Sequence, residues 1–379
     1  MSTDDPVPGP GRFALQPPIE PMLARSIDDL PDSAEGLAFE PKWDGFRCLI
    51  YRRGDDVAIQ GRMRAADADA TSKWDLTYAF PEMVERVRAM TAMDFVLDGE
   101  LVVISGGRLS FELLGGRLRP RKEAGGWKID QLARDFPTSF IGFDVLAVDG
   151  RDVRATPTRS RRALLVDLLD PEPPPIHLTP QTEDLDVARR WFAELPGAGL
   201  DGLIAKPLDQ PYAPGRRTMF KVKPVHTADV VCAGWRTYAR PGPDGSPVVG
   251  SVLIGLYDDS GVLQMIGAVS AFPMAQRVAL AERFAGLASV GAHPWLDPKG
   301  RAPGTPSRWQ SGRSTDWHPL RPVLVAEVAY DKVESGRLRH VASFVRWRPD
   351  KDPAQCRYDQ LAVPEPLDLR QVLDSREHR

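Results

Sequence analysis

Proline and glycine recur along the whole chain, and this restricts the possible fold more than any other feature of the sequence. There are 36 prolines and 32 glycines among 379 residues. Both residue types interrupt helices and favour turns. We therefore expect many turns and short strands, and we disfavour a bundle of long helices.

Strand-like and helix-like segments follow one another without the regular alternation of a βαβ fold. Segments rich in β-branched and aromatic residues, which predict strands, lie at residues 37–53, 94–104, 138–150, 199–207 and 219–236. Segments with apolar residues three and four positions apart, which predict helices, lie at residues 80–90, 160–169 and 186–195. The expected class is α+β.

The character of the chain changes after Pro224. Five short alternating segments follow, with one helix-like pattern near residues 274–287. Five strands and one helix suggest a small closed barrel. We therefore expect two domains, residues 1–224 and residues 225–379, with a tail at the C-terminal end. The connection from Ala292 to Pro319 is long, and long ordered connections are often functional.

Bulk charge and cysteine content restrict the function only weakly. Lys and Arg total 49 against 52 Asp and Glu, a net charge of -3, which neither indicates nor excludes a polyanionic partner. Cys48, Cys232 and Cys356 are far apart, so no disulfide framework or zinc site is expected. The polar, proline-rich N-terminal residues predict neither a signal peptide nor a membrane span. These features fit a cytoplasmic protein without a membrane partner.

Lys42 lies in the segment FEPKWDGFR, where Asp44, Gly45 and Arg47 complete the pattern K-x-D-G-x-R. A lysine can attack the α-phosphate of a nucleotide only as the free amine, whereas an ordinary lysine has a pKa of about 10.4. Burial and neighbouring cations would favour the neutral amine. The K-x-D-G pattern alone fits an exposed lysine beside a turn equally well.

Four other segments supply the remaining groups that nucleotide chemistry requires. Carboxylates hold magnesium, lysines neutralise phosphate oxygens, and an aromatic ring stacks on a purine. Each such residue alone is more often a core or solvated side chain, but an ordered set is an implausible coincidence. The set comprises Glu100 in LDGE, Phe143 and Asp144 in FDVLAVDG, Asp201 and Lys206 in DGLIAK, and Lys221 and Lys223 in FKVK.

In this order, these segments resemble the nucleotidyltransferase motifs of ATP-dependent DNA ligases over nearly the whole chain. FEPKWDGFR, FDVLAVDG, MFKVKPVHTADVV and FVRWRPDKDP are most similar to the small two-domain bacterial enzymes of the actinobacterial ligase C type. The resemblance implies a nucleotidyltransferase domain, ATP-grasp-like and built of antiparallel sheets, followed by an OB-fold barrel.

The resemblance also implies a role for each residue of the site. Lys42 would carry AMP, Glu40 would read the adenine amino group, and Phe143 would stack on the base. Residues expected to contact ribose or phosphate are Arg47, Arg62, Lys206, Arg217, Lys221 and Lys223, and those expected to orient pyrophosphate are Arg348, Asp350 and Lys351. The expected ligands of Mg²⁺ or Mn²⁺ are Glu100 and Asp201.

Two positions depart from the family pattern. Asp201 stands where many relatives carry Glu, which shortens the reach of the carboxylate toward a metal. The turn around Arg62 reads Gly61-Arg62-Met63-Arg64 and continues into an unusual segment, so Arg64 is an alternative to Arg62.

The implied reaction has three steps. AMP passes from ATP to Lys42, and then from Lys42 to the 5′-phosphate at a nick. The 3′-hydroxyl then displaces AMP and forms the phosphodiester. The substrate would be nicked duplex DNA, in repair, recombination or replication at the nucleoid. The enzyme is expected to be a monomer, with the Ku end-binding protein or a primase-like polymerase as candidate partners. Two basic clusters, GRLRPRK and RSRR, fit DNA phosphate contacts or a solvated face equally well.

Three alternatives share parts of this pattern. An RNA ligase or a capping-type nucleotidyltransferase would use the same lysine. An NAD-dependent ligase is disfavoured because its extra N-terminal domain and zinc cysteines are not seen. A non-catalytic DNA-end binding protein would be expected to lack the lysine, a metal carboxylate or the last family motif. This last motif, here called the closing motif, is RWRPDKDP, and the sequence has all three features.

Overall fold

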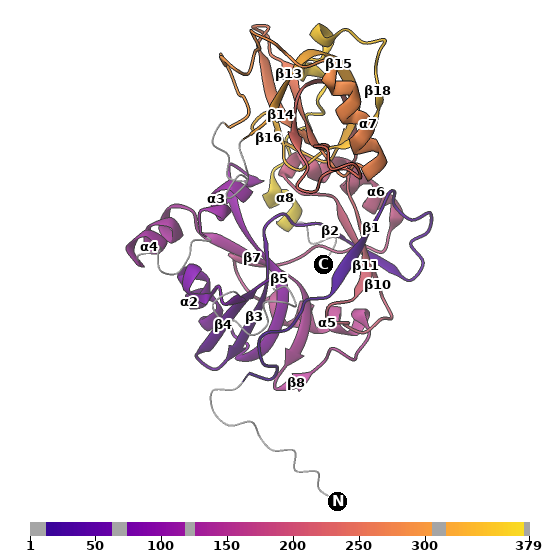
Figure 1. Ribbon diagram of the computed structural model, residues 1–379. Helices are drawn as coiled ribbons and strands as arrows, with labels where there is room; N and C mark the ends of the chain where they lie inside the picture. Colours follow the sequence, from indigo (N-terminus) through magenta and orange to yellow (C-terminus); the bar gives the residue numbers. More distant parts are fainter. Residues whose placement is uncertain (1–12, 63–73, 118–125, 305–315, 375–379) are drawn as a thin grey trace, which may run out of the picture. The chain divides into compact units, whose positions relative to one another are not determined.

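The computed structural model describes residues 13–62, 74–117, 126–304 and 316–374. The chain divides into two units, one formed by residues 1–223 with 364–379 and the other by residues 224–363 (Figure 1). In the part of the chain that the structure describes, no helix is long and apolar enough to cross a membrane. All three cysteines are buried free thiols.

The smaller sheet of the first unit has four strands in the order β1-β11-β10-β2. Only the β1–β11 pair is parallel. The strands are β1 (Leu23–Ile27), β2 (Leu37–Pro41), β10 (Leu203–Pro207) and β11 (Arg217–Val222).

The larger sheet of the first unit follows the order β4-β3-β5-β7-β8, with β6 paired to β5 and β9 paired to β7. All of its pairs are antiparallel except β7–β9. The strands are β3 (Phe46–Arg53), β4 (Asp56–Gly61), β5 (Asp94–Ser105), β6 (Arg108–Leu109), β7 (Thr138–Val148), β8 (Arg151–Asp152) and β9 (Ile176–Leu178).

Amphipathic helices bury the apolar side chains of both sheets. Phe80, Met83 and Leu165 pack with Phe140 in one core, and Trp191 packs with Phe39 in another. The described helices of this unit are α2 (Pro81–Arg88), α3 (Phe111–Gly115), α4 (Gly126–Asp135), α5 (Thr158–Leu169), α6 (Leu185–Glu194), the C-terminal α8 (Leu369–Asp374), and the short 3₁₀ turns η2 (Thr77–Ala79) and η3 (Leu195–Ala198).

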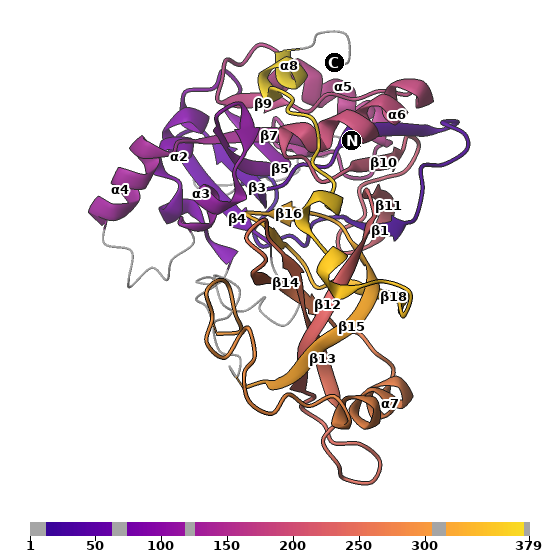
Figure 2. The same cartoon turned by 90° about the horizontal axis from the view of Figure 1, so that it is seen from above.

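The turn that carries Lys42 links the two sheets, because β2 belongs to the smaller sheet and β3 to the larger one. Two backbone hydrogen bonds attach this turn to the segment before β10: Lys42 N–H donates to Gly202 O at 2.8 Å and Asp201 N–H donates to Lys42 O at 3.1 Å. The topology therefore places the lysine where the two sheets meet. Figure 2 shows strands of both sheets, β3, β5 and β7 of the larger one and β1, β10 and β11 of the smaller one.

The second unit is a five-stranded sheet in the order β14-β13-β12-β15-β18, with all pairs antiparallel. Its main elements are β12 (His226–Thr237), β13 (Val249–Tyr257), β14 (Leu263–Val269), α7 (Met274–Ala285), β15 (His318–Tyr330) and β18 (Ser343–Trp347), and the smaller ones are β16 (Val333–Glu334), β17 (Arg337–Leu338), η4 (Pro353–Gln355) and η5 (Tyr358–Gln360). The five predicted strands and the single helix are confirmed.

The long connection before β15 contributes to the core of the second unit. Trp295 is 3% exposed, and its indole N–H donates to Leu263 O at 2.8 Å. Residues 305–315 of this connection lie outside the described part of the chain. A function for the connection stays a prediction.

The C-terminal segment belongs to the first unit, whereas the sequence suggested a tail of the barrel domain. Leu369 and Leu373 are buried against the core that contains Trp191. Leu369 N–H also donates to Gly107 O at 2.7 Å. Because these leucines are four positions apart, they lie on one face of α8 and can bury their side chains together.

Candidate active site

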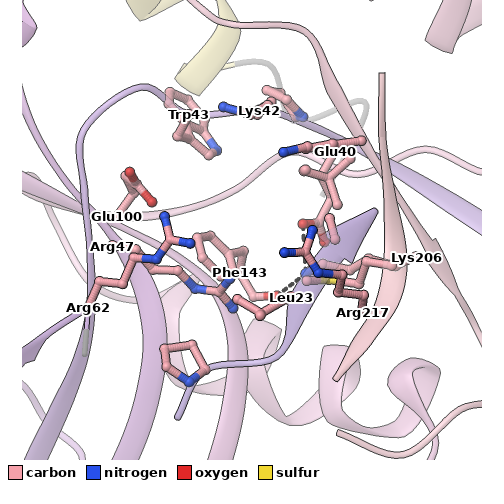
Figure 3. Close-up of a pocket in the computed structure, with 16 residues that line it drawn as sticks. Leu23, Glu40, Lys42, Trp43, Arg47, Arg62, Glu100, Phe143, Lys206 and Arg217 are labelled. Atoms are coloured by element: carbon pink, nitrogen blue, oxygen red, sulfur yellow. Dashed lines mark hydrogen bonds and ion pairs between the residues drawn. The ribbon is translucent and has the colours of Figure 1, made fainter. Parts of the chain in front are cut away.

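A cavity of about 300 Å³ lies beside the turn that carries Lys42. Nine of the residues predicted from the sequence line it, and they come from both sheets (Figure 3): Glu40, Lys42, Arg47, Arg62, Glu100, Phe143, Lys206, Arg217 and Lys221. In Figure 3, Phe143 lies between a group containing Glu40, Lys206 and Arg217 and a group containing Arg47, Arg62 and Glu100.

Asp201 holds the amine of Lys42. The Nζ atoms of Lys42 and Lys223 lie 2.8 Å and 2.7 Å from the same oxygen, Asp201 Oδ2. Burial raises the pKa of Asp201, but the two ammonium groups outweigh burial and lower this pKa to about 2. Asp201 therefore stays ionised at neutral pH. The sequence predicted Asp201 as a metal ligand of the site, and the structure places its carboxylate in direct contact with Lys42.

Glu100 lies at the other side of the lysine turn. The backbone N–H of Gly45 donates to Glu100 Oε1 at 3.1 Å. Burial raises the pKa of Glu100 to about 8, although Lys42 and Arg47 act to lower it. A side chain at position 45 would overlap this strand, because a Cβ atom there would lie 2.1 Å from Leu101 O. The glycine of the K-x-D-G pattern is therefore required for close approach of the turn to β5.

Asp98 and Tyr212 fix the guanidinium of Arg47. Arg47 donates to both oxygens of Asp98, from Nε at 3.0 Å and from Nη2 at 2.7 Å. The hydroxyl of Tyr212 donates to Asp98 Oδ2 at 2.6 Å and accepts from Met22 N–H at 3.0 Å. Asp98 and Tyr212 were not selected from the sequence. Asp98 is in the LDGE segment and could have been, whereas Tyr212 carries no comparable signal.

Lys206 is buried at the side of Phe143, with its ammonium bound to protein groups. Its Nζ lies 2.8 Å from Glu40 Oε2 and donates to Phe143 O at 2.6 Å. Nζ also lies 5.0 Å from the centre of the Phe143 ring. The second oxygen of Glu40 accepts from Gln181 Nε2 at 2.9 Å. In the structure the ammonium of Lys206 is paired with a buried carboxylate, and its phosphate contact stays a prediction.

Positive charge gathers around Lys221 in the cavity, where Arg62 and Arg217 also contribute to the lining. Burial lowers the pKa of Lys221, and the cations Lys42 and Lys223 lower it further. Bringing like charges together is unfavourable unless an anion is bound among them. This part of the cavity is suited to the phosphates of a nucleotide. Arg64, the alternative to Arg62, lies outside the described residues.

Comparisons with known proteins agree with this geometry. A family model described as "ATP dependent DNA ligase domain" matches residues 21–223, and one described as "ATP dependent DNA ligase C terminal region" matches residues 245–351. The chain belongs to the ATP-dependent DNA ligases. This ligase uses ATP to seal nicks in DNA. Its expected fold, a nucleotidyltransferase domain of antiparallel sheets followed by an OB-fold, is confirmed.

Curated relatives of the ligase match it over almost their full lengths. DNA ligase C2 of Mycolicibacterium smegmatis is 42% identical over 92% of this chain and 95% of that protein. DNA ligase C of Mycobacterium tuberculosis is 40% identical over 96% of this chain and 99% of that protein. DNA ligase C1 of M. smegmatis is 42% identical over 96% of this chain and 99% of that protein. The resemblance to ligase C is confirmed.

The closing motif of the ligase lies in the second unit, directly after β18. Arg348 Nη1 donates to Asp229 at 2.9 Å, and Arg348 Nη2 donates to Asp350 at 2.8 Å. Lys351 Nζ lies 3.7 Å from Asp229. Asp229, on β12, was not selected from the sequence. Its carboxylate is a partner of both cations of the motif.

The structure corrects the interpretation of the two basic clusters. Arg117 is 1% exposed and donates to Glu82 at 2.7 Å, and Arg161 is fully buried and donates to Asp144 at 2.8 Å. Both are internal ion pairs and not DNA contacts. Arg159 is exposed beside Asp209. Arg119, Arg121 and Lys122 of the first cluster lie outside the described residues.

The carboxyl groups at the lysine turn fit a divalent metal only together with a substrate. Among the described residues, no group of three or more histidine, cysteine or acidic side chains could hold a metal ion. Mg²⁺ is often held by one or two carboxylates together with water and substrate phosphates. The hard oxygen donors of Glu100 and Asp201 fit this arrangement.

Proposed function

We propose that Lys42 is the residue of this ligase that carries AMP. Its amine is held beside a cavity with a basic wall, and the direct contact with Asp201 supports the assignment most strongly. In the first step, the lysine nitrogen bonds to the α-phosphorus as the bond to pyrophosphate breaks, and the ammonium proton leaves to water. The ion pair with Asp201 must break before this attack, so Asp201 controls when Lys42 becomes a nucleophile.

The base of ATP lies against Phe143 and is read by Glu40 in this proposal. An aromatic face accepts any base, whereas an ionised carboxylate only accepts hydrogen bonds. Glu40 therefore favours the 6-amino group of adenine over the 6-carbonyl group of guanine. Arg47, held by Asp98, contacts the ribose and the adjacent phosphate.

Glu100 and Asp201 are proposed to hold Mg²⁺ or Mn²⁺ with the phosphates of ATP. A bound divalent cation would neutralise charge on the phosphate oxygens during transfer. Arg62, Arg217, Lys221 and Lys223 add positive charge to that side. Lys206 is proposed to support Glu40 and Phe143, in agreement with its contacts.

The second unit is proposed to approach the cavity during adenylylation. Arg348 and Lys351 could then orient pyrophosphate as it leaves, and Asp350 would hold Arg348. Such closure gates many transferases. The unit would then open so that AMP passes to the 5′-phosphate of nicked duplex DNA, and the 3′-hydroxyl would displace AMP. We propose domain limits of residues 1–224 and 225–363, with the C-terminal segment on the first domain, close to the two units described above.

The cellular role that we propose is nick sealing in DNA repair and recombination, by a monomer at the nucleoid of the cytoplasm. The proposed partner in this role is Ku or a primase-like repair polymerase. The similarity to DNA ligase C of Mycobacterium tuberculosis supports the nick-sealing part of this proposal.

The assignment of Lys42 is tested by substitution to alanine. Lys42→Ala should form no covalent AMP adduct and should still bind nicked DNA, because the rest of the chain is unchanged. Lys299→Ala, at an exposed lysine, serves as the control and should be adenylylated normally. An AMP adduct on Lys42→Ala, measured by intact mass, would exclude Lys42 as the nucleophile.

A further inference from the structure

The segment around β9 and the residues after it is attached to the strand that leads to Lys42. Phe39 and Thr182 exchange two backbone hydrogen bonds, at 2.7 Å and 3.0 Å. The indole N–H of Trp43 donates to Thr179 Oγ1 at 2.8 Å. These bonds lie on either side of Glu40, so the segment holds a fixed position relative to its carboxylate.

Gln181 projects from this segment to Glu40. Its Nε2 donates to Glu40 Oε1 at 2.9 Å, while Lys206 Nζ lies 2.8 Å from Glu40 Oε2. Glu40 lines the cavity and is only 2% exposed. Gln181 is outside the set of residues that line the cavity. It therefore contacts the Glu40 carboxylate from outside the lining of the cavity.

Two hydrogen-bond donors fix the orientation of the Glu40 carboxylate more firmly than one donor does. The terminal torsion of a glutamate is broad, so a single ion pair with Lys206 would leave the plane of the Glu40 carboxylate free to turn. A second donor on the other oxygen fixes this plane. The amide of Gln181 does so without adding a second positive charge, which would compete for the carboxylate and reduce its strength as an acceptor.

We propose that Gln181 is a positioning residue for base selection, which aims the free lone pairs of Glu40 at the 6-amino group of adenine. This inference rests on the proposed role of Glu40. A site built around a hydrogen bond to one substrate group rejects an analogue without that group strongly, because its own buried polar group is then left unpaired. Selection by Glu40 therefore depends on how firmly the carboxylate is aimed.

The test replaces the amide while keeping the length of the side chain. Gln181→Met removes the donor, and Gln131→Met, at an exposed position of α4, is the matched control. The rate of Lys42 adenylylation is measured with ATP, with GTP, and with purine riboside triphosphate, which has hydrogen in place of the 6-amino group. Thermal unfolding is recorded for each variant.

Gln181→Met should lower kcat/KM for ATP by about tenfold, mainly by raising KM, which is the expected scale for one hydrogen bond to a charged group. It should leave the rate with purine riboside triphosphate unchanged, so the preference for ATP over GTP falls. Gln131→Met should behave as the parent. Equal losses with ATP and with purine riboside triphosphate, or no loss with either, would overturn the inference.

Two further variants separate this inference from the function on which it rests. Glu40→Gln should lose the preference for ATP, and if it keeps that preference the proposed role of Glu40 is wrong. If Glu40→Gln loses the preference and Gln181→Met keeps it, only the role of Gln181 is wrong. Should Gln181→Met fail to fold, Gln181→Asn, which keeps an amide but shortens its reach, should show the same selective loss for ATP, and an unselective loss would overturn the inference.

Discussion

Replacing Gly45 with alanine should displace the lysine turn from the larger sheet. An added Cβ atom would lie 2.1 Å from Leu101 O, 2.9 Å from Val102 Cγ1 and 3.0 Å from Glu100 Cγ. The first of these atoms is backbone in β5, which is paired on both sides, to β3 and β7. The turn must therefore move by more than about 1 Å, because an ordinary van der Waals contact is about 3.5 Å.

Overpacking of this kind lowers the free energy of unfolding by about 1–3 kcal/mol. We expect Gly45→Ala to lie near the upper end, because the strand that the added Cβ meets, β5, is paired on both sides. With a urea slope of about 3 kcal/mol per M, the unfolding midpoint of the first unit should fall by about 1 M. Because the turn carries Lys42, adenylylation should also slow by about 100-fold, as expected for a displacement of about 1 Å in a reacting group.

The matched control is Gly116→Ala. Gly116 has a φ of -63°, and the nearest atom to an added Cβ would be Leu113 O at 3.4 Å. This variant should keep both its unfolding midpoint and its adenylylation rate. If Gly45→Ala matched Gly116→Ala in both measurements, the close approach of the turn to β5 would not be required, and the reasoning would fail.

Three further predictions follow from the same unit. Asp98→Asn should raise KM for ATP and destabilise the protein by about 3 kcal/mol, because Arg47 loses the charge of its buried partner; unchanged urea unfolding and KM would contradict this. In metal-free buffer, stability should fall as pH rises between 4.5 and 8, because folded Glu100, with a pKa of about 8, retains a proton that the unfolded chain releases. Glu100→Gln should reduce this slope, and an unchanged slope in urea titrations would refute the raised pKa. Truncation after Val363 removes α8 and its two buried leucines, each contributing about 1.5–3 kcal/mol when fully buried. The unfolding free energy of the truncated protein should fall by about 3 kcal/mol after the entropy of ordering α8 is subtracted, and an unchanged midpoint would show that α8 does not support the first unit.

Much of the cavity could be predicted because its residues lie in short segments with strong local patterns. Lys42, Asp44 and Gly45 are consecutive or nearly so, and alternation along β11 predicts which of its side chains share a face. The segments contain strands whose pairing then brings their ends together. The five-stranded second unit was predictable for the same reason, since alternation of apolar residues marks each strand.

Partners that are distant in sequence could not be predicted. From the sequence, Arg117 and Arg161 fitted DNA contacts and a solvated face equally well, because nothing near them in the sequence reveals that Glu82 and Asp144 face them in the folded chain. Lys206 similarly meets Glu40 only through the pairing of β10 with β2. The position of each charge depends on tertiary pairing, which a local motif does not contain.

The C-terminal segment was misassigned for a related reason. The spacing of Leu369 and Leu373 predicts an amphipathic turn of helix, but the pattern does not reveal which domain offers an apolar surface. The structure places both side chains in the core beside Trp191. Sequence order therefore assigned the segment to the barrel domain, although it packs on the first unit.

The most direct test of the central claim is the intact mass of the ligase after incubation with ATP and Mg²⁺, followed by peptide mapping. We predict the addition of one AMP, located on Lys42, and its discharge when nicked duplex DNA is added, with formation of sealed product. Nicked RNA, added separately, should neither discharge the adduct nor be sealed. The absence of an adduct, an adduct on another residue, or discharge by RNA alone would contradict the account.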